Sequence, residues 1–232
     1  MITIRKGVDR GRANHGWLDA RHTFSFANYY HPDHMGFRSL RVMNEDRINP
    51  GAGFPPHPHQ DMEIITYVLE GALAHKDSTG GEGVIRPGTV QYMSAGKGVT
   101  HSEFNASDEE LVHLYQIWIM PNRGGVEPRY EERQIGEARD GALALIASGD
   151  GRDGSFKIHQ DADLYASVVK EGASLSHGFA PGRFGWLQIA KGGVELPGGS
   201  VMQAGDGAKI NDLDRLNFKA LADSEILLFD LA

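Results

Sequence analysis

Short apolar runs separated by glycine recur along the chain and predict a protein built mainly from β-strands. Four runs show this most clearly: residues 64–69, 111–120, 185–190 and 224–230. The second run is apolar at both odd and even positions until Pro121, which is typical of a strand buried on both faces. Only the charged segment 129–139 suggests a helix, and we expect it to connect two halves of the chain.

A faint internal repeat predicts that the two halves are similar barrels in tandem. Residues 68–73 resemble residues 189–194, and residues 86–92 resemble residues 203–209. The copies differ in length at a predicted hairpin tip, where deletions cost little.

Composition bounds the class of protein. The 232 residues include 30 glycines and no cysteine, and the formal net charge is −8. This length suits two small domains, which we place at 1–130 and 131–232. Without thiolates, a metal must be held by nitrogen and oxygen ligands. The negative charge argues against direct nucleic-acid binding, which depends on Lys and Arg neutralising phosphates.

The location expected from the sequence is the cytoplasm. No apolar run approaches the ~20 residues of a membrane span, so we expect no membrane association. Residues 1–6 also lack the apolar stretch of a secretory signal. The absence of cysteine suits the cytoplasm, although it suits the periplasm as well.

Two short motifs predict a metal site in the first half, where nine of the eleven histidines lie. His57-Pro58-His59 and His101-Ser102-Glu103 each carry two candidate ligands at positions i and i+2. On a strand this spacing directs both side chains to one face of the sheet. We expect the two strands to face one another inside a barrel and to bring three imidazoles and one carboxylate around one ion. Projection of the repeat places Gly178, Ala180, Phe218 and Ala220 where the first copy has His57, His59, His101 and Glu103.

Other interpretations of these residues are weaker. An isolated His-x-His is usually polar decoration at a sheet edge, but the second motif and the flanking glycines favour ligands. His-x-Glu also opens the zinc-deaminase signature, which needs cysteines that this chain lacks. His75 closes a predicted strand, and we expect its side chain at the surface.

The motifs match most of the two metal-binding motifs of the cupin barrels. They run Gly51-x5-His57-x-His59-x3-Glu63 and Gly98-x2-His101-x-Glu103-x-Asn105, with Gly71 one position late and Gly96 where proline is usual. Longer segments resemble the pirin family: residues 16–30, 35–42, 56–63, 93–103 and 114–119. Pirins are bicupins with iron in the N-terminal barrel only. The resemblance therefore implies an all-β fold of two tandem cupin (jelly-roll-like) barrels with few short helices, the metal in 1–130 and none in 131–232.

The resemblance assigns the metal ligands to His57, His59, His101 and Glu103. Glu63 competes with Glu103, because the equivalent glutamate is the third ligand in many other cupins and strand parity does not separate the two. We favour Glu103, whose direction is set by its i, i+2 partner His101. Glu63 then becomes a carboxylate behind the ligands or in the pocket wall.

Bacterial pirins are similar to quercetin 2,3-dioxygenases, so the resemblance implies O2-dependent ring cleavage of a flavonol such as quercetin. The cofactor implied is one divalent ion, Fe(II), which would bind the substrate directly through its deprotonated hydroxyl. Glu103 or Glu63 would take the proton as general base. Ligand type alone also accepts Mn, Co, Ni, Cu or Zn.

A second hypothesis is a non-enzymatic, redox-sensing pirin that regulates a protein partner, since the mammalian member is known mainly as a nuclear co-regulator of transcription. A third is a metal-free barrel such as a sugar epimerase. We expect a monomer, because two barrels in tandem already bury much of the surface that cupin dimers bury.

Overall fold

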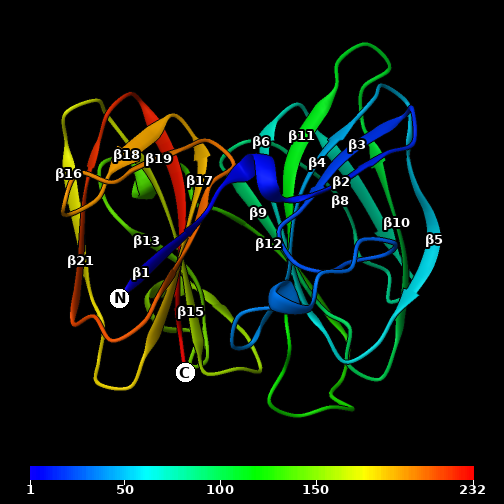
Figure 1. Ribbon diagram of the computed structural model, residues 1–232. Coiled ribbons are helices and arrows are strands. Elements are labelled where there is room, and N and C mark those ends of the chain that lie inside the picture. Colours follow the sequence, from blue (N-terminus) through cyan, green and yellow to red (C-terminus); the bar gives the residue numbers. More distant parts are fainter. The chain divides into compact units, whose positions relative to one another are not determined.

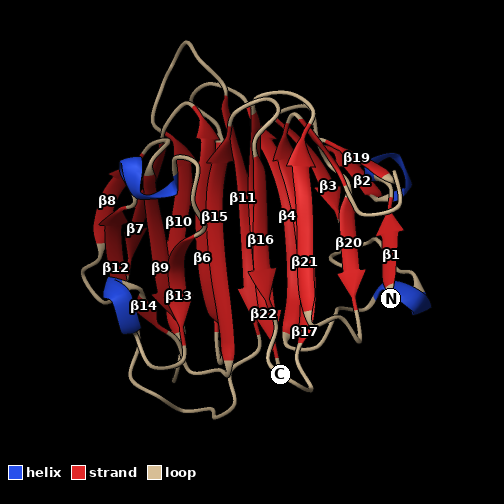
Figure 2. Cartoon of the chain, turned by 90° about the vertical axis from the view of Figure 1, so that its left-hand side faces the viewer, coloured by secondary structure: helices blue, strands red, loops and turns tan.

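Strands make up most of the chain, as the pattern of short apolar runs predicts (Figure 2). The computed structural model describes all residues from 1 to 232. Between the strands lie only four short 3-10 turns: η1 (Gly7–Asp9), η2 (Pro32–His34), η3 (Gly136–Arg139) and η4 (Arg152–Gly154). The all-β fold class is therefore confirmed. No helix has both the length and the apolar character needed to cross a membrane.

The chain divides into two compact units whose members do not follow simple chain order. The N-terminal unit consists of Gly11–Gln134 together with Ile158–Gln160. The C-terminal unit consists of Met1–Arg10, Ile135–Lys157 and Asp161–Ala232. Each unit contains one seven-stranded and one four-stranded sheet (Figure 1).

The N-terminal unit is antiparallel throughout. Its large sheet has the order β12 (Arg129–Gln134), β9 (Thr89–Ser94), β6 (Glu63–Glu70), β11 (Val112–Ile119), β4 (Leu40–Ile48), β3 (Leu18–His22) and β2 (Gly11–Asn14). Its small sheet has the order β5 (Gly53–His59), β10 (Val99–Asn105), β7 (Leu73–Asp77) and β8 (Glu82–Ile85). The runs 64–69 and 111–120 become the neighbours β6 and β11, almost entirely buried, as their composition predicts.

The C-terminal unit repeats this strand order, except that the last two strands of its large sheet pair in parallel. Its large sheet has the order β1 (Ile2–Arg5), β20 (Gly207–Ile210), β17 (Phe184–Lys191), β22 (Ser224–Leu231), β15 (Ala162–Val169), β13 (Ala144–Ser148) and β14 (Phe156–Lys157). Its small sheet has the order β16 (Ser174–Gly178), β21 (Arg215–Ala220), β18 (Gly193–Glu195) and β19 (Val201–Gln203). The faint repeat therefore extends over the strand order of both sheets.

The projection of the repeat onto the ligand positions is wrong by one residue in β16 and by two residues in β21. Leu73 pairs with Asn105 and its repeat counterpart Val194 pairs with Ala220, so Leu216 is the counterpart of His101 and Phe218 that of Glu103. His57 pairs with His101 and His177 pairs with Leu216, so His177 is the counterpart of His57. The projection assumed loops of equal length, but the connection from His177 to Gly185 is longer than the one from His57 to Ile64, and the connection from Gly205 to Leu216 is shorter than the one from Gly88 to His101.

The helix expected over 129–139 does not form. Its first part is strand β12, paired with β9, and only η3 at its end is helical. Arg129 and Arg133 each form an ion pair with Glu131, at 3.0 and 2.8 Å. Charges at i and i+2 share one face of a strand, whereas a helix would bring i and i+4 together.

The first strand of the chain belongs to the C-terminal unit. β1 pairs with β20, from Ile2 opposite Ile210 to Arg5 opposite Gly207. The Lys6 ammonium lies 2.8 Å from the Asp206 carboxylate, and the Gly7 amide donates to the same carboxylate at 2.7 Å. β1 therefore occupies the sheet-edge place that β12 holds in the N-terminal unit.

The repeated glycines Gly71 and Gly192 yield a test of the packing. They have φ of +75° and +72°, and a Cβ would lie 2.4 Å from the Leu111 carbonyl oxygen and 2.4 Å from the Ser224 Oγ, respectively. We expect Gly71→Ala and Gly192→Ala each to lower the unfolding free energy by about 2–4 kcal/mol, from backbone strain plus the clash. Gly16→Ala is the control, because Gly16 has φ +83° but open space around its Cβ, and should cost about 1 kcal/mol. Urea unfolding measures the difference, and equal losses at all three positions would contradict this account.

Candidate metal centre

Strands β5 and β10 carry the predicted ligands and are hydrogen-bonded neighbours, with His57 directly opposite His101. The expectation that the two strands face one another across a barrel is therefore wrong: they lie side by side in the small sheet. β5 is the edge strand of that sheet. An edge position suits its prolines at positions 55, 56 and 58, because proline has no N–H to donate to a second neighbour.

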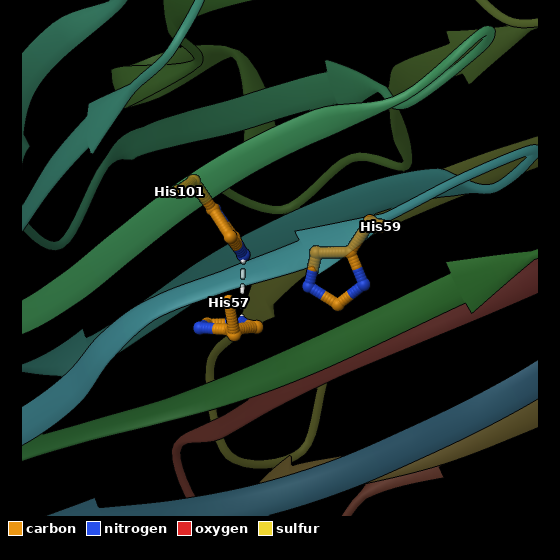
Figure 3. A group of neighbouring side chains, drawn as sticks. All are labelled: His57, His59 and His101. Atoms are coloured by element: carbon orange, nitrogen blue, oxygen red, sulfur yellow. Dashed lines mark hydrogen bonds between the residues drawn. The ribbon is translucent and has the colours of Figure 1, made fainter.

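The three imidazoles of His57, His59 and His101 converge (Figure 3). Their ring centroids are 4.5–4.8 Å apart. One ligand nitrogen from each ring lies within 4.8 Å of the other two. The closest approach is 3.0 Å, between the Nε2 atoms of His101 and His57. The structure thus brings together in one group three of the four predicted ligands, His57, His59 and His101.

Hydrogen bonds assign the tautomer of His57. Its Nδ1 lies 2.8 Å from the Pro55 carbonyl oxygen, which can only accept, so Nδ1 carries the proton and Nε2 presents a lone pair. Burial, followed by the neighbouring imidazoles, lowers the pKa of His59 to about 4 and that of His101 to about 3. Both rings are therefore neutral at physiological pH, the form in which imidazole binds a metal.

The donor set fits a divalent transition metal. Two nitrogens bound to one ion at about 2.1 Å each can be no more than about 4.2 Å apart, and the His57–His101 separation of 3.0 Å meets this condition. Neutral imidazoles suit Zn, Cu, Fe and Ni. The three histidines could accordingly hold one such ion.

Glu103 is grouped with His75 and His101, in a second candidate ligand group that shares His101 with the first. It is buried, and its carboxylate accepts hydrogen bonds from three side chains of the large sheet: Gln116 at 2.9 Å, Gln91 at 3.4 Å and Thr66 at 3.5 Å. His101 and Glu103 both point inward because they are two positions apart on β10, and β5 opposite them contains a register shift. The shift falls at Pro55-Pro56, because Glu103 pairs with Phe54.

Glu63 belongs to a different cluster. Glu63 and Thr66 are three positions apart on strand β6, so their side chains lie on opposite faces of the sheet. Thr66 is the residue whose side chain reaches Glu103. Glu63 accepts hydrogen bonds from Tyr92 and Ser94, and from the backbone amide of His159 at 3.1 Å. Its neighbours thus differ entirely from those of Glu103.

Three buried groups near the histidines were not predicted from the sequence: His75, Asp77 and Asp46. His75, expected at the surface, is only 2% exposed, because β7 is covered on its inner face and pairs with β10. Its partner Asp77 is stabilised as a carboxylate: burial raises the pKa, but hydrogen bonds, first from Thr79 and then from His75, hold it below its usual value. Burial, followed by the charges of Glu103 and Glu45, raises the pKa of Asp46 to about 7. The sequence offered one sign of these buried groups, the pair His75 and Asp77 at the end of a predicted strand.

A cavity of about 490 Å³ lies one aromatic ring away from the cluster, and none of the three histidines lines it. Its walls include Trp17, Phe26, Tyr29 and Phe54. The Phe54 ring lies 6.2 Å from the His57 ring, and Phe26 contacts Trp118, whose ring lies 4.9 Å from His59. The cavity is thus linked to two of the three histidines by ring contacts.

Comparisons with known proteins agree with these features. Residues 5–119 match the family described as Pirin, and residues 145–231 match the family described as Quercetinase C-terminal cupin domain. The chain is 50% identical over 231 residues to a protein named quercetin 2,3-dioxygenase from Escherichia coli (strain K12), with 100% of this chain and 99% of that protein covered. The crystal structure of YhhW from Escherichia coli has a TM-score of 0.96 at 50% identity, covering 100% of this chain and 98% of that one. A structure described as bacterial pirin YhhW in complex with nickel(II) has a TM-score of 0.94 at 49% identity, covering 100% and 99%.

The two units offer a matched pair of variants for testing metal binding. We expect His59→Ala to lower the metal content of protein loaded with Ni(II) at least tenfold, because it removes one of three convergent nitrogens. His177→Ala should leave the metal content unchanged, since His177 has the strand position of His57 but pairs with Leu216 and is bonded to the Asp230 carboxylate. Elemental analysis after gel filtration gives the ratio. Equal metal loss in both variants, or in neither, would argue against the cluster.

Proposed function

Because the chain belongs to the pirin family, we propose that it is a metal-dependent dioxygenase that cleaves a flavonol such as quercetin with O2. The ion is Fe(II), held by His57, His59, His101 and Glu103. The observation that carries the proposal is the convergence of three imidazoles, with an aromatic cavity one ring away. The name of the Escherichia coli relative and the nickel complex of the solved bacterial pirin support it.

The cavity suits a flat aromatic substrate. Its volume lies in the range of small-molecule sites, about 300–1,000 Å³, and its aromatic walls favour stacking and exclude water. Trp17 and Phe54 meet edge to face, with ring centroids 5.2 Å apart. A substrate between these walls places its polar edge toward His57, which contacts Phe54.

A divalent ion supplies charge that lowers the pKa of a hydroxyl bound to it and so favours the substrate's anionic form. The chain itself accepts the proton. We assign this role to Glu103, whose carboxylate is oriented by the Gln116 and Gln91 amides and lies in the same ligand group as His101. A carboxylate within reach of the ligands suits a general base.

Glu63 takes a structural role in this proposal. Its oxygens accept from Tyr92, Ser94 and His159, and the Tyr92 phenol remains a donor because burial, followed by the charge of Glu63, raises its pKa. The segment Ile158–Gln160 is held further by the bond from the Asn122 amide to the His159 carbonyl at 2.6 Å. Glu63 therefore anchors a returning segment of the chain in the N-terminal unit.

Oxygen and metal dependence test the activity. Protein loaded with Fe(II) should consume quercetin in air, followed by loss of flavonol absorbance, and should be inactive without O2. Removal of the metal with a chelator should abolish the rate, and Fe(II) should restore it. No oxygen-dependent loss of absorbance from protein with a full metal complement would sink the proposal and leave the redox-sensing hypothesis in its place.

A second test addresses the cavity. Phe54→Ala should lower kcat/KM for quercetin about tenfold, because it removes roughly 1–2 kcal/mol of apolar contact beside His57. Phe104→Ala is the control, since Phe104 lies on the adjacent strand β10 with its side chain directed outward and 39% exposed. Steady-state kinetics on both variants decide the matter, and similar effects at the two positions would place the substrate elsewhere.

A further inference from the structure

A chain of hydrogen bonds leads away from the candidate metal cluster through His75. The Nδ1 atoms of His101 and His75 lie 3.4 Å apart, and the Nε2 of His75 lies 2.9 Å from the Asp77 carboxylate. All three side chains point inward, because β10 and β7 pair with His101 opposite Asp77 and Glu103 opposite His75.

The Asp77 end of this series of hydrogen bonds is held in place by further bonds. The second oxygen of Asp77 accepts from the Thr79 amide at 2.7 Å, the Thr79 hydroxyl at 2.6 Å and the Gly81 amide at 3.0 Å. These bonds tie the carboxylate to the β7–β8 hairpin. Its remaining oxygen is thereby directed at His75.

The plane of the His75 ring is fixed as well. Tyr130 stacks on it, with ring centroids 4.5 Å apart and an interplanar angle of 16°. The Tyr130 hydroxyl is in turn bonded to Glu132 and to Gln91. His75 can therefore neither rotate freely nor approach water.

The Asp77 carboxylate at the end of this series of hydrogen bonds determines which nitrogen atoms carry the protons. A carboxylate only accepts, so the Nε2 of His75 carries a proton and its Nδ1 has a lone pair. That lone pair accepts the Nδ1 proton of His101. The Nε2 of His101 is then left with its lone pair facing His57, as a ligand requires.

We propose that His75 is a positioning residue, which with Asp77 sets the tautomer and orientation of His101 so that its Nε2 binds the metal. The inference rests on the metal ligands of the proposed function. It differs from ligation by His75 itself, because both nitrogens of that ring are already engaged, one by His101 and one by Asp77. The backbone performs the same task for His57 through the Pro55 carbonyl.

Three substitutions separate the hydrogen bond from bulk. His75→Phe keeps a ring to stack on Tyr130 but removes the acceptor for His101. His75→Asn restores an acceptor oxygen near the Nδ1 position. Asp77→Asn can present a donor to His75, which reverses its tautomer and turns its Nδ1 into a second donor facing His101.

Ni(II) affinity, measured by competition with a coloured chelator, is the main readout. Loss of such an outer partner typically weakens metal binding by about 10–100-fold, so we expect that loss for His75→Phe and Asp77→Asn. His75→Asn should remain within about threefold of the unmodified protein. The absorption spectrum of bound Co(II) should shift in the two weakened variants, because the orientation of one ligand changes.

A buried histidine outside the cluster supplies the control. His113 is buried and bonded to the Glu45 carboxylate at 2.9 Å, so His113→Phe reproduces the loss of a histidine–carboxylate contact. It should leave Ni(II) affinity and the Co(II) spectrum unchanged.

The proposal is overturned if His75→Phe and Asp77→Asn bind Ni(II) as tightly as the unmodified protein. It is also overturned if His75→Asn loses the metal completely, which would make His75 a ligand. Retention of metal by His59→Ala would instead refute the ligand set of the proposed function, so the two failures are distinguishable. Should His75→Phe fail to fold, Asp77→Asn, which is nearly isosteric, decides the question alone.

Discussion

The direct pairing of His57 with His101 across β5 and β10 is the contact on which the candidate site depends. Side chains alternate between the two faces of a strand, so a slip of one residue would turn every ligand on β5 outward. Two features keep this register. β10 is held on its other side by β7, and the irregularity at Pro55-Pro56 lets Phe54 and His57 both face inward.

Most polar groups around the histidines are paired, the Trp118 Nε1 and one Asp46 oxygen being the exceptions. Glu103 receives bonds from amides and a hydroxyl of the facing sheet, and His75 is bonded at both nitrogens. Buried polar groups are costly when unpaired, whereas a completed network makes the core rigid and specific. The cluster and its supports therefore form a rigid setting in which an ion could bind.

The strands and the histidine pairs could be predicted from the sequence, because both depend on local periodicity. Runs such as 111–120 are apolar on both parities, and His57-Pro58-His59 needs only a strand to align its rings. The features that could not be predicted depend on contacts between distant parts of the chain. The burial of His75 follows from its pairing with Glu103, which lies far along the chain. The charged segment 129–139 has the composition of a helix, but its first part forms strand β12 because β9 offers an edge for it to pair with. The place of His177 depended on a loop length that no local pattern revealed.

The two carboxylates that the motifs could not separate are separated by the geometry of one strand. Glu63 and Thr66 lie on opposite faces of β6, and only the face of Thr66 looks toward Glu103. Odd or even numbering compares residues only within one strand, so it could not relate Glu63 on β6 to the histidines on β5 and β10.

The edge strand β1 has a consequence for biosynthesis. Its residues leave the ribosome long before those of β20, against which they pair. A chain growing at about 5–20 residues per second must therefore wait at least ten seconds or so with this segment unpaired. The C-terminal unit can close only after β20 has been translated, and until then β1 is exposed to proteases and chaperones.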